Sequence, residues 1–465
     1  MKIQFYGAAR TVTGSKHLIT TDKGVRILLD CGMFQGIGTT EMNQRFGFEP
    51  ASVDYLVLSH AHIDHCGLIP RLVAKGFRGP IYCTDATKDL CRYLLSDSAH
   101  IQETDLKRVN ERRENRGEKP LESLYTQDDV ETAMGLFTTV DYHQTVFLNP
   151  EISVCFYDAG HLLGSASVFL TIKEGDDAKK LWFTGDIGRP DDRILRCPEP
   201  VPQADYIITE STYGDRLHET EPDMKSHLLR IVQKTCVENK GKLIIPAFAV
   251  DRTQELIFAL DQLESEDRLP PIKVFIDSPL AINATRVMRD HEECFNPDIL
   301  QYIKKDGDAF DFPTLKYVSD VAQSKGINSL KEPCVIISAS GMAEAGRIKH
   351  HIRNNVEDPR NTILIVGYCS PDSLGGALKR GDKEVRIFGE TFAVRAHVEI
   401  MDSFSAHADY KEMIKHLSTQ DPTQIKELFL VHGDYDTQLA FKGHLEGAGF
   451  QNIYIPEMLE SVTLS

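Results

Sequence analysis

Three histidines and one aspartate fall within six residues at the end of one predicted strand. The stretch Ser59–His65, with the sequence SHAHIDH, directly follows the apolar run Val53–Leu58. On an extended backbone, residues two apart project to the same side, as His60 and His62 would here. Imidazole nitrogens and a carboxylate at this density are ligands typical of a zinc-type ion. Because one tetrahedral ion cannot readily take all four ligands from so short a segment, we expect two adjacent ions.

The alternative is a group of surface histidines or of hydrogen-bonded histidines in the core. Histidine accounts for only 17 of the 465 residues, so such a dense pattern seldom arises by chance. We therefore prefer the metal site, in which His60, His62, Asp64 and His65 are ligands.

Three further candidates also stand where predicted strands end. Asp30 follows the apolar run Arg26–Leu29, and Asp186 follows an apolar strand that includes Phe183. His161 lies in a loop with glycines on both sides. Any one of these residues alone would be explained as a turn residue. Together they supply what two ions still need: His161 as a ligand, Asp186 as a carboxylate bridge, and Asp30 as a carboxylate that orients a ligand.

The composition is that of a globular protein with more than one domain. A chain of 465 residues is too long for one hydrophobic core, and 41% of these residues are apolar. The N-terminus lacks the pattern of a signal peptide, and no apolar run is long enough to span a bilayer. Ten cysteines without a Cys-x-x-Cys pair indicate reduced thiols. We therefore expect a cytoplasmic protein that has no membrane partner.

The net charge limits the class of substrate. The formal charge of −17 has the wrong sign for a protein that coats nucleic acid. A polyanionic substrate would need bound metal ions and a local group of basic residues to overcome this charge. The segment 101–119 contains several arginines, but interleaved glutamates favour a solvated helix face over a phosphate-binding patch.

The periodicity of the sequence changes after residue 210. Short strands dominate before it, whereas beyond it helices near Met224–Cys236 and Thr253–Leu263 alternate with strands. The strands predicted there are Lys242–Pro246, Lys273–Ile276, Cys334–Ser338 and Thr362–Val366. This alternation is typical of a separate domain with a parallel α/β sheet. Towards the C-terminus, His407 and His432 return to the pattern of histidines in loops that follow strands.

Taken in chain order, the candidates in the first half resemble the motifs of a known superfamily. Asp30, the cluster His60–His65, His161 and Asp186 are similar to the four successive motifs of the metallo-β-lactamase superfamily. The resemblance covers residues 1 to about 210. It implies an α/β fold in which two sheets pack face to face between outer helices, an αββα sandwich with the metals at one edge.

The second half resembles the β-CASP branch of this superfamily, whose members are mostly RNA and DNA nucleases. Glu210, His407 and His432 are similar to three motifs of the branch, and Ala249–Glu255 and Ser338–Met342 also resemble it. The chain is most similar to prokaryotic homologues of the endonuclease subunit of the cleavage and polyadenylation specificity factor. The resemblance implies a metallo-β-lactamase domain in residues 1–210, an inserted β-CASP domain in 211–395, and a segment completing the first domain in 396–465.

The resemblance also implies the cofactor and the reaction. The implied ligands are His60, His62 and His161 for one Zn²⁺ and Asp64, His65 and His432 for a second, with Asp186 bridging them. A water held between two Zn²⁺ ions has a pKa near neutrality, which provides a hydroxide nucleophile. The expected enzyme is a ribonuclease that cleaves single-stranded RNA internally, with 5′→3′ exonuclease action left open. Because water attacks, the products would carry a 5′-phosphate and a 3′-hydroxyl.

One pair of residues is expected to handle the proton of the leaving group. His407 is the candidate general acid for the 3′-oxygen, and Glu210 would hold it and keep it protonated. The alternative is that Glu210 and His407 form a hydrogen bond with a purely structural role.

Substrate contacts are predicted in the second half of the chain. Ser338, Ser340 and Gly341 follow a strand and precede a helical run, so their backbone N–H groups and hydroxyls could bind a phosphate. The basic candidates are Arg252, Lys379 and Arg380, each of which could equally be an ordinary surface charge. His350 and His351 have no nearby acid in the sequence, so we expect them to face solvent or a phosphate and not a metal.

Two other functions compete with a nuclease. One is a small-molecule hydrolase of the same superfamily, such as a thioesterase or lactonase, which the acidic net charge favours. The other is a catalytically inactive scaffold, which the complete set of candidate ligands disfavours. The oligomeric state is not predicted by any pattern in the sequence.

Overall fold

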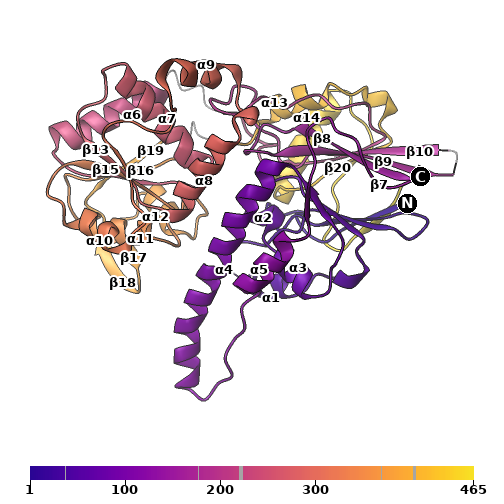
Figure 1. The fold of residues 1–465 in the computed structure, drawn as a ribbon, viewed down its shortest axis with the longest axis horizontal. Helices are drawn as coiled ribbons and strands as arrows, with labels where there is room; N and C mark the ends of the chain where they lie inside the picture. Colours follow the sequence, from indigo (N-terminus) through magenta and orange to yellow (C-terminus); the bar gives the residue numbers. More distant parts are fainter. Residues whose placement is uncertain (37, 176, 219–223, 368, 402–404, 465) are drawn as a thin grey trace. The chain divides into compact units, whose positions relative to one another are not determined.

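The computed structural model describes residues 1–36, 38–175, 177–218, 224–367, 369–401 and 405–464. It contains two compact units (Figure 1). Unit 1 comprises Met1–Leu217 together with Ala406–Ser465, and unit 2 comprises His218–Ser405. In the sequence, unit 2 is therefore an insertion into unit 1.

The first sheet of unit 1 has seven strands. These are β1 (Lys2–Phe5), β2 (His17–Thr20), β3 (Arg26–Leu29), β4 (Tyr55–Val57), β5 (Ile81–Cys83), β6 (Phe137–Thr139) and β22 (Ser461–Thr463). Their order is β22-β1-β2-β3-β4-β5-β6. Because β3, β4, β5 and β6 are parallel neighbours, their carboxyl ends lie along one edge of the sheet.

The second sheet of unit 1 also has seven strands. These are β7 (Val146–Asn149), β8 (Ile152–Asp158), β9 (Ala166–Glu174), β10 (Asp177–Phe183), β11 (Tyr206–Thr209), β20 (Glu427–Leu430) and β21 (Ile453–Tyr454). Their order is β21-β20-β11-β10-β9-β8-β7. The parallel strands β10, β11 and β20 place Phe183, Ile208 and Phe429 side by side. Strand β20 comes from the second segment of unit 1, so the sheet joins residues more than 200 positions apart.

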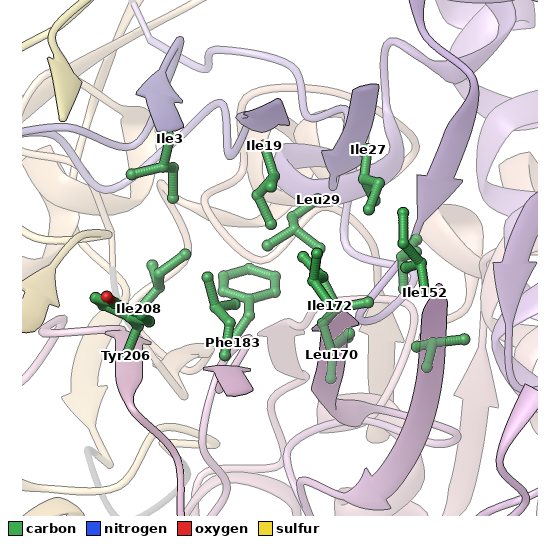
Figure 2. Packing of buried hydrophobic residues seen from close by; sticks show 14 of the residues in the cluster. Ile3, Ile19, Ile27, Leu29, Ile152, Leu170, Ile172, Phe183, Tyr206 and Ile208 are labelled. Atoms are coloured by element: carbon green, nitrogen blue, oxygen red, sulfur yellow. The ribbon is translucent and has the colours of Figure 1, made fainter. Parts of the chain in front are cut away.

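The two sheets pack face to face through their apolar side chains. Ile19 and Leu29 of the first sheet belong to the same buried cluster as Leu170, Phe183 and Ile208 of the second (Figure 2). Along these strands, apolar residues either alternate with polar ones or follow one another without a break. The first pattern suits a sheet buried on one face, and the second suits a sheet buried on both faces. Burial of this cluster fixes the two sheets against each other, and with them the loops at their edges.

Helices cover the outer faces of the sandwich. The helices of unit 1 are α1 (Thr40–Gln44), α2 (Ile63–Cys66), α3 (Ile69–Ala74), α4 (Asp85–Glu114), α5 (Gln127–Met134), α13 (Tyr410–Leu417) and α14 (Tyr435–Gly447). Met413 of α13 and Phe441 of α14 pack with Trp182 and Leu428 of the second sheet. Helices α2–α5 lie on the side of the first sheet (Figure 1). The predicted αββα sandwich is confirmed.

Unit 2 is built around a parallel sheet. In sheet order, its strands are β14 (Leu315–Tyr317), β13 (Lys273–Ile276), β15 (Cys334–Ser338), β12 (Leu243–Pro246), β16 (Thr362–Ile365) and β19 (His397–Ile400). All five neighbouring pairs are parallel, which confirms the predicted parallel α/β sheet. Two further strands, β17 (Glu384–Ile387) and β18 (Glu390–Ala393), form a hairpin.

In the described part of unit 2, seven α-helices connect or flank these strands. They are α6 (Met224–Val232), α7 (Arg252–Ser265), α8 (Pro279–Asp290), α9 (Pro297–Asp306), α10 (Val321–Ser329), α11 (Ile348–Asn355) and α12 (Leu374–Lys379), with α8 and α9 in succession between β13 and β14. Each βα connection places its loop at the carboxyl edge of the sheet, where α/β domains commonly bind ligands. Throughout the part of the chain that the structure describes, no helix is both long enough and apolar enough to span a membrane.

Candidate metal centre

Loops from both sheets of unit 1 converge at one edge of the sandwich. Asp30 follows β3, and the cluster His60–His65 follows β4. In the second sheet, Asp186 follows β10 and His432 follows β20, while His161 lies in the loop between β8 and β9. Five stretches that are distant in the sequence therefore meet because the strands before or after them end at the same edge.

The loops approach one another closely at two glycines. A Cβ atom on Gly32 would lie 1.6 Å from the backbone oxygen of Asp64, and one on Gly188 would lie 1.7 Å from the backbone oxygen of Gly160. Only glycine allows backbones to come so near. The absence of a side chain at Gly32 thus leaves room for the turn that carries Asp64. In the same way, Gly188 allows the loops of His161 and Asp186 to pack together.

Three imidazole nitrogens meet in a first group, which we call the three-histidine group (His60, His62 and His161). His62 Nδ1 lies 3.1 Å from His60 Nε2 and 3.2 Å from His161 Nε2. The carboxylate oxygen Oδ2 of Asp186 lies 3.5 Å from both of these Nε2 atoms. The four side chains offer ligand atoms close enough together to hold one ion.

A second group, which we call the Asp64 group, consists of Asp64, His65 and His432. The Nε2 atoms of His65 and His432 are 3.1 Å apart, and His432 Nε2 is 3.4 Å from Asp64 Oδ2. The other oxygen of Asp186, Oδ1, lies 3.4 Å from His65 Nε2 and 3.8 Å from His432 Nε2. Asp186 thus presents one oxygen to each group, as a bridging carboxylate does.

Asp30 holds two of the histidines from behind. Its Oδ2 accepts a hydrogen bond from His65 Nδ1 at 2.7 Å, and Ser15 and Ser59 donate their hydroxyls to it. The Ser59 hydroxyl, 3.0 Å from His60 Nδ1, accepts from that nitrogen. Because both Nδ1 atoms are held from outside the centre, the Nε2 atoms of His60 and His65 point into it.

His161 and His432 are likewise held through Nδ1, whereas His62 turns its own Nδ1 towards the centre. His161 Nδ1 donates to the backbone oxygen of Ala406 at 3.3 Å. His432 Nδ1 lies 3.0 Å from the hydroxyl of Thr212, which itself donates to the His432 backbone oxygen. Ser15 and Thr212 were not predicted from the sequence, because a hydroxyl that orients a distant ring carries no local signal.

The geometry fits metal ions better than it fits hydrogen bonds. Nitrogen ligands about 2.05 Å from a tetrahedral zinc are separated by about 3.3 Å, close to the 3.1–3.2 Å seen between these rings. Within the described residues, Asp186 Oδ1 is buried and has no hydrogen-bond partner. A buried carboxylate oxygen without a donor is costly unless a cation satisfies it. The residues present therefore suit two divalent ions.

Electrostatics support this interpretation. Burial lowers the pKa of His60 and His161 well below the ordinary value, which leaves the neutral imidazoles that metals bind. In the Asp64 group, burial also opposes charge, but the nearby carboxylates Asp186 and Asp30 raise the pKa of His65 well above its ordinary value. The buried carboxylates therefore stabilise a positive charge at this position.

Glu210 and His407 form a pair beside the three-histidine group. His407 Nδ1 lies 3.1 Å and 3.2 Å from the two carboxylate oxygens of buried Glu210, and the Ile187 N–H donates to Glu210 at 2.5 Å. The His407 and His161 rings are 4.5 Å apart. Burial disfavours the His407 cation, but Glu210 outweighs this and raises the pKa of His407 to about 9. The pair is thus placed to keep a proton next to the centre.

The predicted phosphate loop lies in unit 2, at the carboxyl end of β15. Ser338 is buried, and its hydroxyl donates to the backbone oxygen of Asp277 at 2.7 Å. The Ser340 hydroxyl accepts from the N–H groups of Glu344 and Ala345. Gly341 packs against the ring of Phe248. Both hydroxyls therefore already have partners in the protein, and phosphate binding there stays a prediction.

The three predicted basic contacts differ in their surroundings. Arg252 is 6% exposed and forms an ion pair with Glu255. Arg380 is exposed and pairs with Asp382 at 2.9 Å, while Lys379 is half-buried at the end of α12. Their role in substrate binding stays a prediction, and the buried ion pair of Arg252 gives that residue a structural role as well.

The expectation for His351 was wrong. The ring is fully buried and contacts an acid, because His351 Nε2 lies 2.7 Å from Asp277 Oδ2. His351 Nδ1 lies 2.9 Å from Asn328 Oδ1. The error arose because Asp277 is 74 positions away and reaches His351 only through the parallel sheet. His350, by contrast, is exposed as expected.

Comparison with protein families gives three matches. Residues 18–196 match the metallo-beta-lactamase superfamily domain, and residues 253–378 match the Beta-Casp domain. Residues 391–456 match a domain described as the Zn-dependent metallo-hydrolase RNA specificity domain.

Individual relatives are similar over nearly the whole chain. The chain is 34% identical over 440 residues to ribonuclease TTHA0252 of Thermus thermophilus, covering 95% of both proteins. It is 31% identical to the transcription termination factor FttA of Methanocaldococcus jannaschii, over 99% of this chain and 71% of that protein. It is 31% identical to cleavage and polyadenylation specificity factor 73 of Drosophila melanogaster, over 95% of this chain and 61% of that protein.

Proposed function

We propose, from the premise that this chain belongs to the β-CASP family of metallo-β-lactamase-fold proteins, that it is a zinc-dependent ribonuclease. The reaction would be hydrolysis of internal phosphodiester bonds in single-stranded RNA, with 5′-phosphate and 3′-hydroxyl products. The relative from Thermus thermophilus is named a ribonuclease, and the family match over residues 391–456 is described as an RNA specificity domain.

The observation that carries the proposal is the position of Asp186. Its two oxygens face two separate groups of ligand atoms at 3.4–3.8 Å, and one of these oxygens lacks a hydrogen-bond partner among the described residues. We propose that Asp186 is shared by two Zn²⁺ ions. The three-histidine group would hold one ion, and the Asp64 group would hold the other.

The metal ions and the side chains around them would have different roles in the reaction. Bound Zn²⁺ would supply a water of lowered pKa and a Lewis acid for the phosphate. Asp30, Ser59 and Thr212 keep the ligand rings in one tautomer, so their lone pairs need no reorganisation when the ions bind.

His407 would give its proton to the leaving 3′-oxygen as the bond from phosphorus to that oxygen breaks. Glu210 holds the ring through Nδ1, which leaves Nε2 as the nitrogen that donates. The side chain of His407 is 21% exposed, so it borders solvent, whereas Glu210 is buried. This difference fits a proton donor supported by a carboxylate that does not itself contact the substrate.

The direct test uses 5′-labelled single-stranded RNA. The zinc-loaded protein should cleave it internally, while a chelator and the double variant Asp64→Ala/His65→Ala should each abolish cleavage. Zinc added back should restore the chelated wild type but not the variant. A thioester and a lactone tested in parallel separate the proposal from a small-molecule hydrolase. Cleavage of RNA that survives both chelation and the double substitution would overturn the proposal.

A further inference from the structure

One surface of unit 2 combines an exposed aromatic ring with basic side chains. It lies on the β17–β18 hairpin and on α11, which are next to each other (Figure 1). The hairpin pairs Ile387 with Glu390, so its loop consists of Phe388 and Gly389 alone. Phe388 is 45% exposed although it is a large apolar residue. A ring held in the open at the tip of a hairpin needs an explanation.

The backbone conformation makes phenylalanine an unexpected choice at this position. Both loop residues have positive φ, 53° at Phe388 and 89° at Gly389, as in a type I′ turn. The first position of that turn favours asparagine, aspartate or glycine, and a bulky residue there is strained. Burial does not compensate for this strain, because the ring is largely exposed. An outlier of this kind points to a functional requirement for the aromatic ring.

Side chains from α11 fix the position of the ring. The His350 ring lies 4.6 Å from that of Phe388 at an angle of 34°, and Lys349 Nζ lies 5.4 Å from the centre of the Phe388 ring. Arg353 of α11 forms an ion pair with Glu390 of the hairpin at 2.8 Å. Hairpin and helix therefore form one surface, and Phe388 is presented in a defined orientation.

The charge of this region is opposite to that of the whole protein. Helix α11 and the hairpin from Glu384 to Ala393 contain three lysines and arginines against two glutamates, whereas the chain as a whole carries −17. Within the described ranges, Lys349 and Arg386 have no carboxylate at ion-pair distance. Arg386 instead directs its Nε towards the backbone oxygen of Gly389 at 3.4 Å, which places its charge at the loop.

We propose that this surface, formed by Lys349, His350, Arg386 and Phe388, binds a segment of single-stranded RNA. A base stacks on Phe388, and Lys349 and Arg386 neutralise the phosphates on either side. Aromatic rings beside basic groups bind single strands in this way, because every base has a face that can stack and every nucleotide carries a charge. The inference rests on the proposed function, since it assigns a second contact to the same RNA.

The substitution Phe388→Asn tests the proposal without damage to the fold. Asparagine suits the turn, so the variant should unfold at the wild-type temperature or above it. Affinity of the full-length, zinc-loaded protein is measured by fluorescence anisotropy with a phosphorothioate RNA of about 20 nucleotides, which keeps its charge and resists hydrolysis. The dissociation constant should rise at least about fivefold for Phe388→Asn and stay near wild type for Phe388→Trp.

Two controls make the result specific. Phe147 in unit 1 is 65% exposed, and Phe147→Asn should leave the affinity unchanged. Lys349→Gln should lower the slope of log affinity against log salt concentration by about 0.7. The inference fails if Phe388→Asn binds within twofold of wild type, or if Phe147→Asn weakens binding as much. If the wild type bound RNA but did not cleave it, the proposed function would be contradicted. The effect of Phe388→Asn on RNA binding could still be judged by itself.

Discussion

Each unit contains a buried histidine–aspartate group, and the two groups differ in what satisfies them. In unit 2, Asp277 receives His351 at 2.7 Å, Arg347 at 2.6 Å and Ser324 at 2.5 Å, and the second nitrogen of His351 is 2.9 Å from Asn328. Each of these polar atoms has a neutral or charged protein partner. The group is closed, and it needs nothing from outside the chain.

In unit 1, the same residue types are left open. Asp30 and Thr212 contact the outer nitrogens of His65 and His432, so the inner nitrogens face each other 3.1 Å apart, close to the bridging oxygen of Asp186. Asp186 is buried with one oxygen that lacks a donor among the described residues. Residue types alone therefore do not distinguish a metal centre from a structural network. The distinguishing feature is where the second nitrogen of each histidine is bound.

The largest effect is expected at the shared carboxylate. Asp186→Ala removes an oxygen from each ligand group, so both zinc content and turnover should fall, turnover by at least about a thousandfold. Elemental analysis and RNA cleavage measure the two effects. Asp191→Ala, at an exposed acid in the loop after Asp186, should change neither. If Asp186→Ala kept the wild-type zinc content, Asp186 would not be a ligand, and the proposed difference between the groups of unit 1 and unit 2 would have no support.

A smaller loss is expected behind the ligands. Asp30→Asn keeps the shape of the side chain but weakens its hold on His65 Nδ1, so zinc affinity should fall about 10–100-fold. Competition with a chromophoric chelator measures this affinity. Activity should return at high zinc concentration, because the ligands themselves remain. Activity that stays lost at saturating zinc would mean that Asp30 acts in the reaction and not through His65.

Glu210→Gln should change the pH profile more than the zinc content. The Glu210 carboxylate raises the pKa of His407, so its neutralisation lowers that pKa. A proton donor works only below its pKa, and the decline of kcat on the alkaline side should therefore begin at lower pH than in wild type. At neutral pH a loss of about tenfold is expected. An unchanged alkaline limb would assign Glu210 a purely structural role.

The smallest effect on metal content is expected in unit 2. His351→Ala leaves the buried carboxylate of Asp277 short of one donor, which should lower the free energy of unfolding by about 2 kcal/mol. Zinc content should stay at the wild-type value. The exposed neighbour offers a matched control, since His350→Ala should alter neither quantity. Loss of zinc in His351→Ala would show that the closed group is also a metal site.

Much of the fold follows from local patterns in the sequence. The runs Arg26–Leu29, Lys273–Ile276 and Cys334–Ser338 are strands with the predicted bounds, because short apolar runs with β-branched residues suit a buried sheet surface. The charged segment 101–119 is helical to Glu114, the end of α4, because its interleaved charges suit a solvated helix, whereas residues 115–119 form a turn and a loop. Local spacing was thus sufficient for element type and for the general architecture.

The candidate site was predictable only where its residues are close in sequence or stand at strand ends. The structure brings all seven predicted ligands together, and the predicted pair Glu210 and His407 lies beside them. It also shows partners that no spacing indicates: Thr212 lies 220 positions from His432, and Asp277 lies 74 from His351. Such pairs depend on the register of distant strands, which the sequence of either segment alone does not encode.

The central claim is that the open group of unit 1 binds two zinc ions, whereas the closed group of unit 2 binds none. Elemental analysis of the purified, zinc-reconstituted chain tests this claim most directly, with Asp186→Ala and His351→Ala measured beside the wild type. We expect two equivalents of zinc per chain in the wild type and in His351→Ala, and fewer in Asp186→Ala. A wild type that takes up no zinc, or an Asp186→Ala variant that keeps both equivalents, would contradict the claim.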